Sequence, residues 1–194
     1  MVAALKQLWG MGLNPVLVAR KEPRLVAVTK HRGEMDTWGQ SVSMGIRCGQ
    51  QPMGLSLMVL AFADAAIFAQ WQLLATAAIY PSLLVASNTH TYHVYLFTGP
   101  EYVGCTLAGR YEARNGHARL VPSITLLGRG QRVAVVGSGD VPYHFPIGKG
   151  YDDIPLVTIA EYEMLLALCR RFDRRTPTAS CAFAVGGRSV YVMG

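Results

Sequence analysis

Two side chains that could bind a phosphate group lie two positions apart in the stretch SNTHTYHVYLF, residues 87–97. If a strand has begun there, Thr91 and His93 point to the same face, because side chains alternate along a strand. A hydroxyl and an imidazole on one face can hold a phosphate through hydrogen bonds, which strengthen with charge. The alternative is a polar hairpin whose histidine caps the edge of a sheet, and the stretch alone favours neither interpretation.

A second pair of polar side chains lies in the stretch RYEARNGHARLVPS. Glu112 and Arg114 are two positions apart and would share one face of a strand. A same-face pair of this kind is typical of a surface salt bridge, which contributes little to stability. Taken by itself, the pair therefore favours a structural ion pair over a site.

A glycine-rich turn follows the apolar run Arg132–Val136, in the sequence RVAVVGSGDVPYH. A dinucleotide-binding fingerprint needs a third small residue three positions after Gly139, where this chain has Pro142. A helix that points its N-terminus at a pyrophosphate is not expected to begin there. The pattern favours a turn between strands, and a small dinucleotide-binding enzyme remains only a distant alternative.

The elements that must position these side chains centre on the apolar run Leu55–Phe62, which predicts a buried strand. Asp64 then has the place of an N-cap for a helix over residues 65–79. Ala61 and Ala63 lie at the end of the strand, where α/β proteins usually carry their functional side chains. A methyl group at both positions needs an explanation.

Further helices and strands are expected on both sides of this unit, and Thr158 and Glu161 have the spacing of a capping box. Strands outnumber helices and do not alternate regularly with them, which predicts an α/β (α+β) fold. We expect a mixed central β-sheet with flanking helices, in a single domain over residues 1–194. The expected elements are helices over 2–11 and 158–172, strands over 14–19, 25–28, 43–47, 83–86, 93–97 and 132–136, a strand pair over 103–114 around Gly109, and a hairpin of 182–185 and 189–192.

Composition narrows the class of partner. Hydrophobic residues make up 51% of the chain and charged residues 15%, but no uninterrupted run of about 18 apolar residues occurs, so no membrane span is expected. The net charge of +6 favours polyanionic partners, nucleic acid first.

The four cysteines are far apart, which argues against a structural zinc site. The start of the chain lacks a secretory-signal pattern, so a reducing, cytoplasmic location is expected.

In order and spacing, these pieces resemble the bifunctional primase-polymerase domain of the archaeo-eukaryotic primase superfamily, over roughly residues 10–165. The family's first motif, Asp-x-Asp or Asp-x-Glu after an apolar strand, corresponds to Ala61-Phe62-Ala63. Its second, Ser/Thr-x-His, corresponds to Thr91-Tyr92-His93. Its third, a single strand acid that often precedes a Pro-Ser turn, corresponds to Tyr111-Glu112. Each motif is short, and their order carries the resemblance.

The resemblance implies an RRM-like sheet and template-directed nucleotidyl transfer from dNTP or NTP by a two-metal mechanism with Mg²⁺ or Mn²⁺. Residues 61 and 63, as Asp in an active parent, and Glu112 would be the catalytic metal ligands. Thr91 and His93 would bind the triphosphate, and a nearby basic residue, Arg114, Arg119 or Lys149, would be a further phosphate contact. The implied partners are single-stranded DNA template and primer, the nucleotide, and a helicase domain or protein of a plasmid, phage or mobile element.

The alanines at positions 61 and 63 imply that the chain as it stands is catalytically inactive. An engineered double substitution that removed both acids explains the intact flanking pattern better than native loss does. The runner-up interpretation is a non-catalytic nucleic-acid-binding module of a replication initiator, in which both alanines are native.

Overall fold

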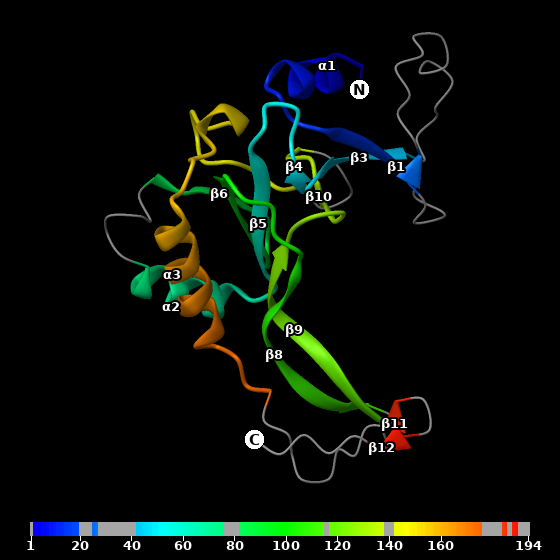
Figure 1. Ribbon diagram of the computed structural model, residues 1–194, viewed down its shortest axis with the longest axis vertical. Helices are drawn as coiled ribbons and strands as arrows, with labels where there is room; N and C mark the ends of the chain where they lie inside the picture. The colour runs from blue at the N-terminus through cyan, green and yellow to red at the C-terminus, as the bar shows by residue number, and fades with distance from the viewer. Residues whose placement is uncertain are drawn as a thin grey trace.

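The strand β5 (Ser56–Phe62) is the centre of the main sheet of the computed structural model (Figure 1). The structure describes residues 2–19, 25–26, 42–75, 82–114, 117–137, 142–175, 184–185 and 188–189. The described elements are, in chain order, α1 (Val2–Gly10), β1 (Pro15–Ala19), β2 (Leu25–Val26), β3 (Val42–Arg47), β4 (Gly49–Gln50), β5, α2 (Ala65–Leu74), β6 (Leu84–Ser87), β7 (Tyr92–Thr98), β8 (Cys105–Arg114), β9 (His117–Leu127), β10 (Arg132–Ala134), a 3₁₀ turn (Tyr151–Asp153), α3 (Ile159–Arg170), β11 (Ala184–Val185) and β12 (Arg188–Ser189).

The main sheet has the strand order β6-β7-β5-β9-β8, and β4 pairs with the start of β5. The chain passes from β5 through α2 to β6, and β7 then inserts between these two strands. Both β5 and β6 are antiparallel to β7, which makes the unit a split βαβ arrangement. The predicted α+β fold is confirmed. The sheet differs from the expected mixed sheet because every pairing among its described strands is antiparallel.

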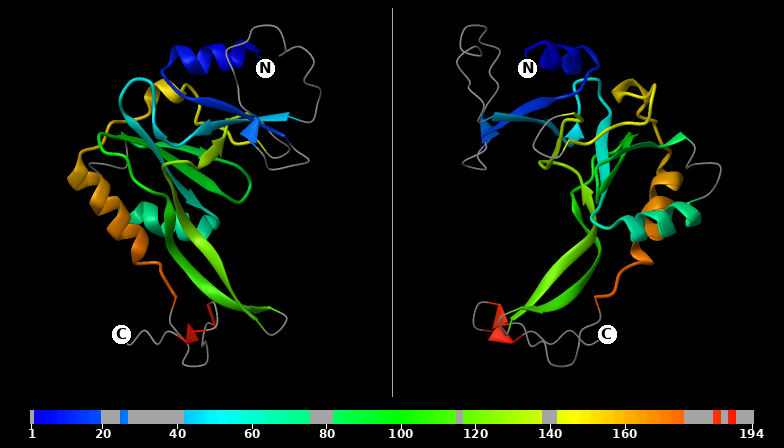
Figure 2. Two further views of the ribbon diagram at one scale, coloured as in Figure 1. Left: turned by 45° about the vertical axis from the view of Figure 1, so that its right-hand side comes forward. Right: turned by 180° about the vertical axis from the view of Figure 1, so that it is seen from behind.

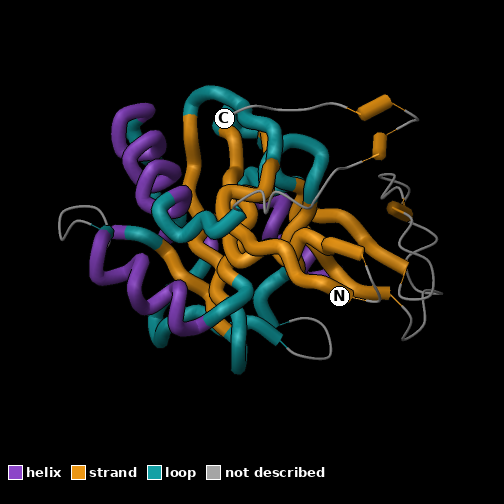
Figure 3. The backbone as a smooth tube through the Cα atoms, turned by 90° about the horizontal axis from the view of Figure 1, so that it is seen from below, coloured by secondary structure: helices purple, strands orange, loops and turns teal. Residues whose placement is uncertain are grey.

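Both faces of β5 are buried, which explains its uninterrupted apolar sequence. Met58 and Leu60 face a core that includes side chains of α2 and α3. Leu57 and Val59 face a second core formed with α1 and the smaller sheet, whose strand order is β10-β3-β1-β2. Figure 2 shows the helices α2 and α3 on one side of β5 and the smaller sheet on the other. Figure 3 shows helices lying outside the strands.

The helix caps agree with the sequence-based expectations. The Asp64 Oδ1 accepts hydrogen bonds from the amides of Ala66 (2.7 Å) and Ile67 (3.1 Å) at the start of α2. At the start of α3, the Thr158 amide donates to the Glu161 carboxylate at 2.7 Å, and the Glu161 amide donates back to the Thr158 hydroxyl at 3.3 Å. This reciprocal pair confirms the predicted capping box. The helix α2 ends at Leu74, because its C-cap Ala75 has extended backbone angles, so the helix predicted over 65–79 ends earlier than expected. Residues 76–79 lie outside the described residues.

The prediction of a strand pair over 103–114 is wrong. The strand β8 runs without a turn through Gly109 and pairs with β9, a long strand that the sequence reading missed. A side chain at position 109 would bring its Cβ within 2.9 Å of the Val121 carbonyl oxygen, so glycine here permits close approach of β9. The β8–β9 ribbon projects beyond the rest of the sheet (Figure 1).

Three further expectations concern the hairpin of 182–185 and 189–192, membrane spans and the cysteines. The strands β11 and β12 pair antiparallel as predicted, although the turn residues 186–187 lie outside the described residues. No helix in the described ranges is both long and apolar enough to cross a membrane. Cys48, Cys105 and Cys169 are free thiols, and Cys181 lies outside the described residues.

Candidate functional site

Ala61 of β5 and His93 of β7 are directly opposite each other in the antiparallel register. Opposite residues in such a pair project to the same face, with Cβ atoms about 4.5–5.5 Å apart. Thr125 of β9 is the neighbour of Ala61 on its other side. The structure therefore brings the first and second sequence motifs together at the end of the strand that leads into α2.

The imidazole of His93 is enclosed by small and aromatic residues. Its neighbours across the sheet are Ala61 and Ala86, and its ring stacks on the Tyr143 ring with centroids 4.0 Å apart. Only 9% of the His93 surface is exposed, and its Nδ1 has no hydrogen-bond partner among the described residues. Burial lowers the pKa of His93 to about 4, so the ring is neutral at pH 7. A neutral, covered imidazole is a weak ligand for a phosphate.

The alternative interpretation of His93 as a cap on a sheet edge is wrong, because β7 lies between β6 and β5 in the interior of the sheet. The alanines on both sides leave room for the imidazole and the tyrosine ring above it. No sequence pattern links Tyr143 to His93, because the two lie 50 positions apart in the chain and only the fold brings them together.

Thr91 shares the environment of His93, as its spacing predicted. Its hydroxyl forms hydrogen bonds with the Asn88 Oδ1 at 2.8 Å and with the Tyr143 hydroxyl at 2.6 Å. The same Asn88 oxygen accepts the Thr91 amide at 2.8 Å, which closes an Asx turn before β7. The Thr91 hydroxyl is therefore used to fix the turn and the tyrosine.

Ala63 differs from Ala61 in its environment. Ala61 is half-buried within β5, whereas Ala63 follows the strand and is exposed. The Ala63 amide donates to the Ser123 carbonyl oxygen of β9 at 2.9 Å. The neighbouring carboxylate of Asp64 caps α2. An acid at position 63 would therefore face solvent beside β9.

Glu112 does not lie at the end of β5 beside Ala61 and Ala63. It pairs with Arg119, four positions along β9 from Ser123, which corresponds to about 13 Å of strand. Its carboxylate is exposed and forms an ion pair with Arg110 at 2.6 Å. The predicted grouping of Glu112 with positions 61 and 63 therefore has to be corrected: the twisted β8–β9 ribbon carries the acid away from the end of β5.

Arg114 ends β8 opposite His117, and its side chain lies outside the described part of the chain. The other two basic candidates are Arg119 and Lys149. Arg119 is exposed on the ribbon, and Lys149 forms an ion pair with Asp153 at 3.0 Å.

The residues present do not fit the metal centre that the resemblance implies. Mg²⁺ and Mn²⁺ require several oxygen ligands, and Mg²⁺ holds them about 2.0–2.1 Å away. Positions 61 and 63 offer methyl groups, and Glu112 lies on the ribbon. In the described ranges, no three His, Cys, Asp or Glu side chains are grouped closely enough to hold a metal ion.

The glycine-rich turn after β10 does not open a dinucleotide fold. The strand β10 pairs antiparallel with β3 in the smaller sheet, and the next described helical element is the short 3₁₀ turn at Tyr151–Asp153. Residues 138–141 of the turn lie outside the described residues. The predicted turn between strands is not confirmed: after β10 the described chain forms only an isolated bridge between His144 and Ser87 before the 3₁₀ turn.

The exposed half of the β8–β9 ribbon carries a charged face. Arg110, Glu112, Arg119 and His117 occupy alternate or opposite register positions, so they project to the same side. All four are exposed. Glu112 neutralises Arg110, while Arg119 has no ion-pair partner among the described residues. A two-stranded ribbon fits the major groove of a duplex, and its free arginine can contact phosphate.

No protein-family model matches this sequence, and a comparison with curated proteins found no match.

Proposed function

We propose that this chain is a nucleic-acid-binding domain with a primase-polymerase type of framework, and that it does not itself transfer nucleotides. The position of Glu112 carries the proposal. Its carboxylate belongs to the exposed charged face of the β8–β9 ribbon and pairs with Arg110, about 13 Å along the strand from Ser123 beside Ala63. Glu112, the acid that the resemblance assigns to catalysis, therefore lies on the exposed ribbon surface that we propose contacts nucleic acid.

The framework part of the proposal is supported by the register between β5 and β7. The first two motifs of the resemblance meet as Ala61 and His93, in a split βαβ unit at the strand end before α2. The binding part is supported by the net charge of +6 and by the free guanidinium of Arg119 on the projecting ribbon.

A second candidate is a primase-polymerase whose active parent has Asp at positions 61 and 63. The Ala61–His93 register favours it, because an acid at position 61 would lie next to an imidazole. With those two acids restored, Mg²⁺ or Mn²⁺ would supply the charge neutralisation for transfer from dNTP or NTP. The place of Glu112 does not supply a third ligand for that site.

Two assays separate these candidates. The first titrates a labelled single-stranded oligonucleotide and a labelled duplex with the chain and with Arg119→Gln, using Arg129→Gln as a matched control. Arg129 is exposed, and it lies beyond the base of the ribbon, beside Glu101. We expect binding that weakens with salt, a loss for Arg119→Gln and little change for Arg129→Gln.

The second assay compares the chain with the double variant A61D/A63D in primer synthesis on single-stranded template with manganese. The proposal expects no dNTP incorporation by either protein. Incorporation by the double variant alone would favour the second candidate. Absence of any oligonucleotide binding at low salt would contradict the proposed function.

A further inference from the structure

A cleft of about 190 Å³ opens where α2 begins beside β8 and β9. It adjoins the end of β5, because the Ala63 amide donates to the carbonyl oxygen of Ser123, a residue that lines the cleft. Several of its lining residues have side chains that can donate or accept hydrogen bonds: Asp64, Gln70, Arg110, Ser123 and Arg174.

Ser123 is the most buried of these polar side chains. It is 9% exposed, and the hydrogen bond described for it is made by its backbone carbonyl oxygen, which accepts from the Ala63 amide. A serine hydroxyl on a cleft wall can donate a hydrogen bond to an anion that enters the cleft.

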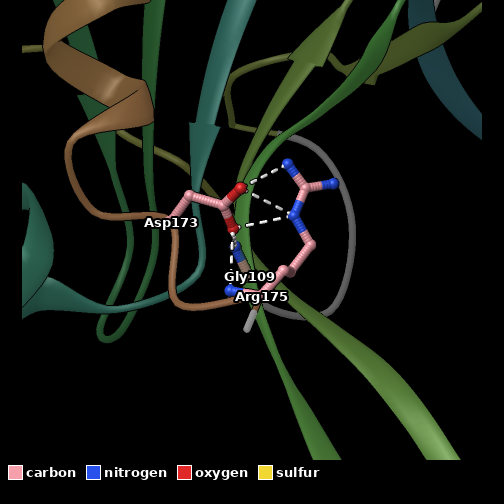
Figure 4. Close-up of polar contacts among 3 residues, drawn as sticks. All are labelled: Gly109, Asp173 and Arg175. Atoms are coloured by element: carbon pink, nitrogen blue, oxygen red, sulfur yellow. Dashed lines mark hydrogen bonds and ion pairs between the residues drawn. The ribbon is translucent and has the colours of Figure 1, made fainter. Parts of the chain in front are cut away.

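Arg174 is held at the cleft through the residues on either side of it in the chain, and Figure 4 shows the bonds that Asp173 makes with Gly109 and Arg175. The Asp173 carboxylate accepts the Gly109 amide at 3.2 Å and binds the Arg175 guanidinium through Nε at 2.7 Å and Nη2 at 2.6 Å. The Arg174 amide donates to the Gly109 carbonyl oxygen at 2.9 Å. These bonds fix the segment against the edge of β8. The Asp173 carboxylate neutralises the Arg175 guanidinium, whereas the Arg174 guanidinium takes no part in these bonds.

The charged side chains that line the cleft are two cations, Arg110 and Arg174, and one anion, Asp64. The Asp64 carboxylate is engaged by the amides of α2, and the Arg110 guanidinium is paired with Glu112. The Arg174 guanidinium has no ion-pair partner among the described residues. Arg110 lines the cleft and also lies on the charged face of the ribbon, so the two surfaces are continuous.

We infer that the cleft binds one backbone phosphate of a nucleic acid whose strand continues along the ribbon. The Arg174 guanidinium and the Ser123 hydroxyl donate hydrogen bonds to that phosphate, and Asp173 is a positioning residue that holds Arg174 in place. The inference rests on the proposed function, and it names a contact that the framework resemblance does not supply.

Salt-dependent binding of a labelled single-stranded oligonucleotide tests the contact. Arg174→Gln should weaken binding about tenfold at low salt and lower the slope of log affinity against log salt by about one. Ser123→Ala should weaken binding less and leave that slope unchanged, because it removes no charge. The matched control is Arg171→Gln, an exposed arginine outside the cleft, which should keep the slope of the parent protein.

Asp173→Asn tests the positioning role. It keeps the side-chain shape but weakens the hold on Arg175, so Arg174 should lose its fixed place and the salt slope should fall toward that of Arg174→Gln. Asp173→Glu should restore part of the slope. A residue with only a structural role would lower the melting temperature and leave the slope unchanged.

The outcomes separate the inference from the proposed function. If the parent chain binds no oligonucleotide, the proposed function fails and the inference fails with it. If the parent binds while Arg174→Gln and Arg171→Gln behave alike, only the inference is overturned. NMR of the Arg174 Nε–H group distinguishes the source of the phosphate. A response to a nucleoside triphosphate or inorganic phosphate, with none to the oligonucleotide, would also overturn it.

Discussion

The rings of His93 and Tyr143 stack with their centroids 4.0 Å apart and their planes inclined by 16°. The contact closes the place where the second sequence motif meets Ala61. The resemblance assigns His93 to nucleotide binding, but in the structure the ring is buried and neutral. Access of a phosphate to His93 would require Tyr143 to move.

The pH dependence of stability should report this burial. Because the folded-state pKa of His93 is about 4 and the unfolded value is near 6.5, the unfolded chain binds more protons between these limits. The stability from the neutral imidazole is present above pH 6.5 and declines as pH falls toward 4, by about 3 kcal/mol in total. Urea titrations over this range should show the decline in the parent protein.

His93→Gln is the control for that experiment, since it cannot gain a proton. Its free energy of unfolding should be less dependent on pH over the same interval. Equal slopes in the parent and in His93→Gln would show that other groups cause the decline.

Substitutions of Tyr143 should separate its ring from its hydroxyl. Tyr143→Phe removes the bond to Thr91 and should lower the free energy of unfolding by about 1 kcal/mol. Tyr143→Ala also removes the stack on His93 and should cost about 3 kcal/mol. Chemical denaturation measures both. Equal costs for the two variants would mean that the ring packing does not stabilise the fold.

An acid at position 61 should change the titration of His93. Ala61→Asp places a carboxylate opposite the imidazole, and an opposite charge at that separation raises the pKa of a histidine by about 1 to 3 pH units. The NMR titration of the His93 ring protons follows this change. Ala63→Asp is the matched control, since position 63 is exposed and lies beyond the paired residues of β5. An unchanged His93 titration in Ala61→Asp would contradict the described register.

The N-cap of α2 offers a test of the strand-to-helix junction. Asp64→Ala removes the acceptor for two amides and should lower the free energy of unfolding by about 1 kcal/mol. Asp152→Ala, at an exposed aspartate, should have a smaller effect on thermal or urea unfolding. Similar losses in both variants would argue against the cap.

Local interactions were the part of the structure that the sequence predicted well. The Asp64 cap and the Thr158–Glu161 capping box depend on residues within one helical turn, so their spacing is visible in the chain. The buried strand β5 was visible because both of its faces are apolar. The α+β class followed from the number and order of such segments.

Interactions between distant segments were not predictable in the same way. The strand β9 was missed because its exposed half is polar and contains Pro122, which interrupts a strand pattern. Glu112 shares a face with both Arg110 and Arg114, and its spacing could not identify Arg110 as its partner. The stack of Tyr143 on His93 and the hydrogen bond from the Gly109 amide to the Asp173 carboxylate both depend on how separate segments pack.

The proposed function requires the projecting β8–β9 ribbon to contact nucleic acid. It is tested by the affinity of the unmodified chain, as a function of salt concentration, for a labelled single-stranded oligonucleotide and for a labelled duplex. Log affinity for at least one of these should fall linearly with log salt, with a slope that decreases in Arg119→Gln. No affinity for either one at low salt, or affinity that does not depend on salt, would contradict the proposed function.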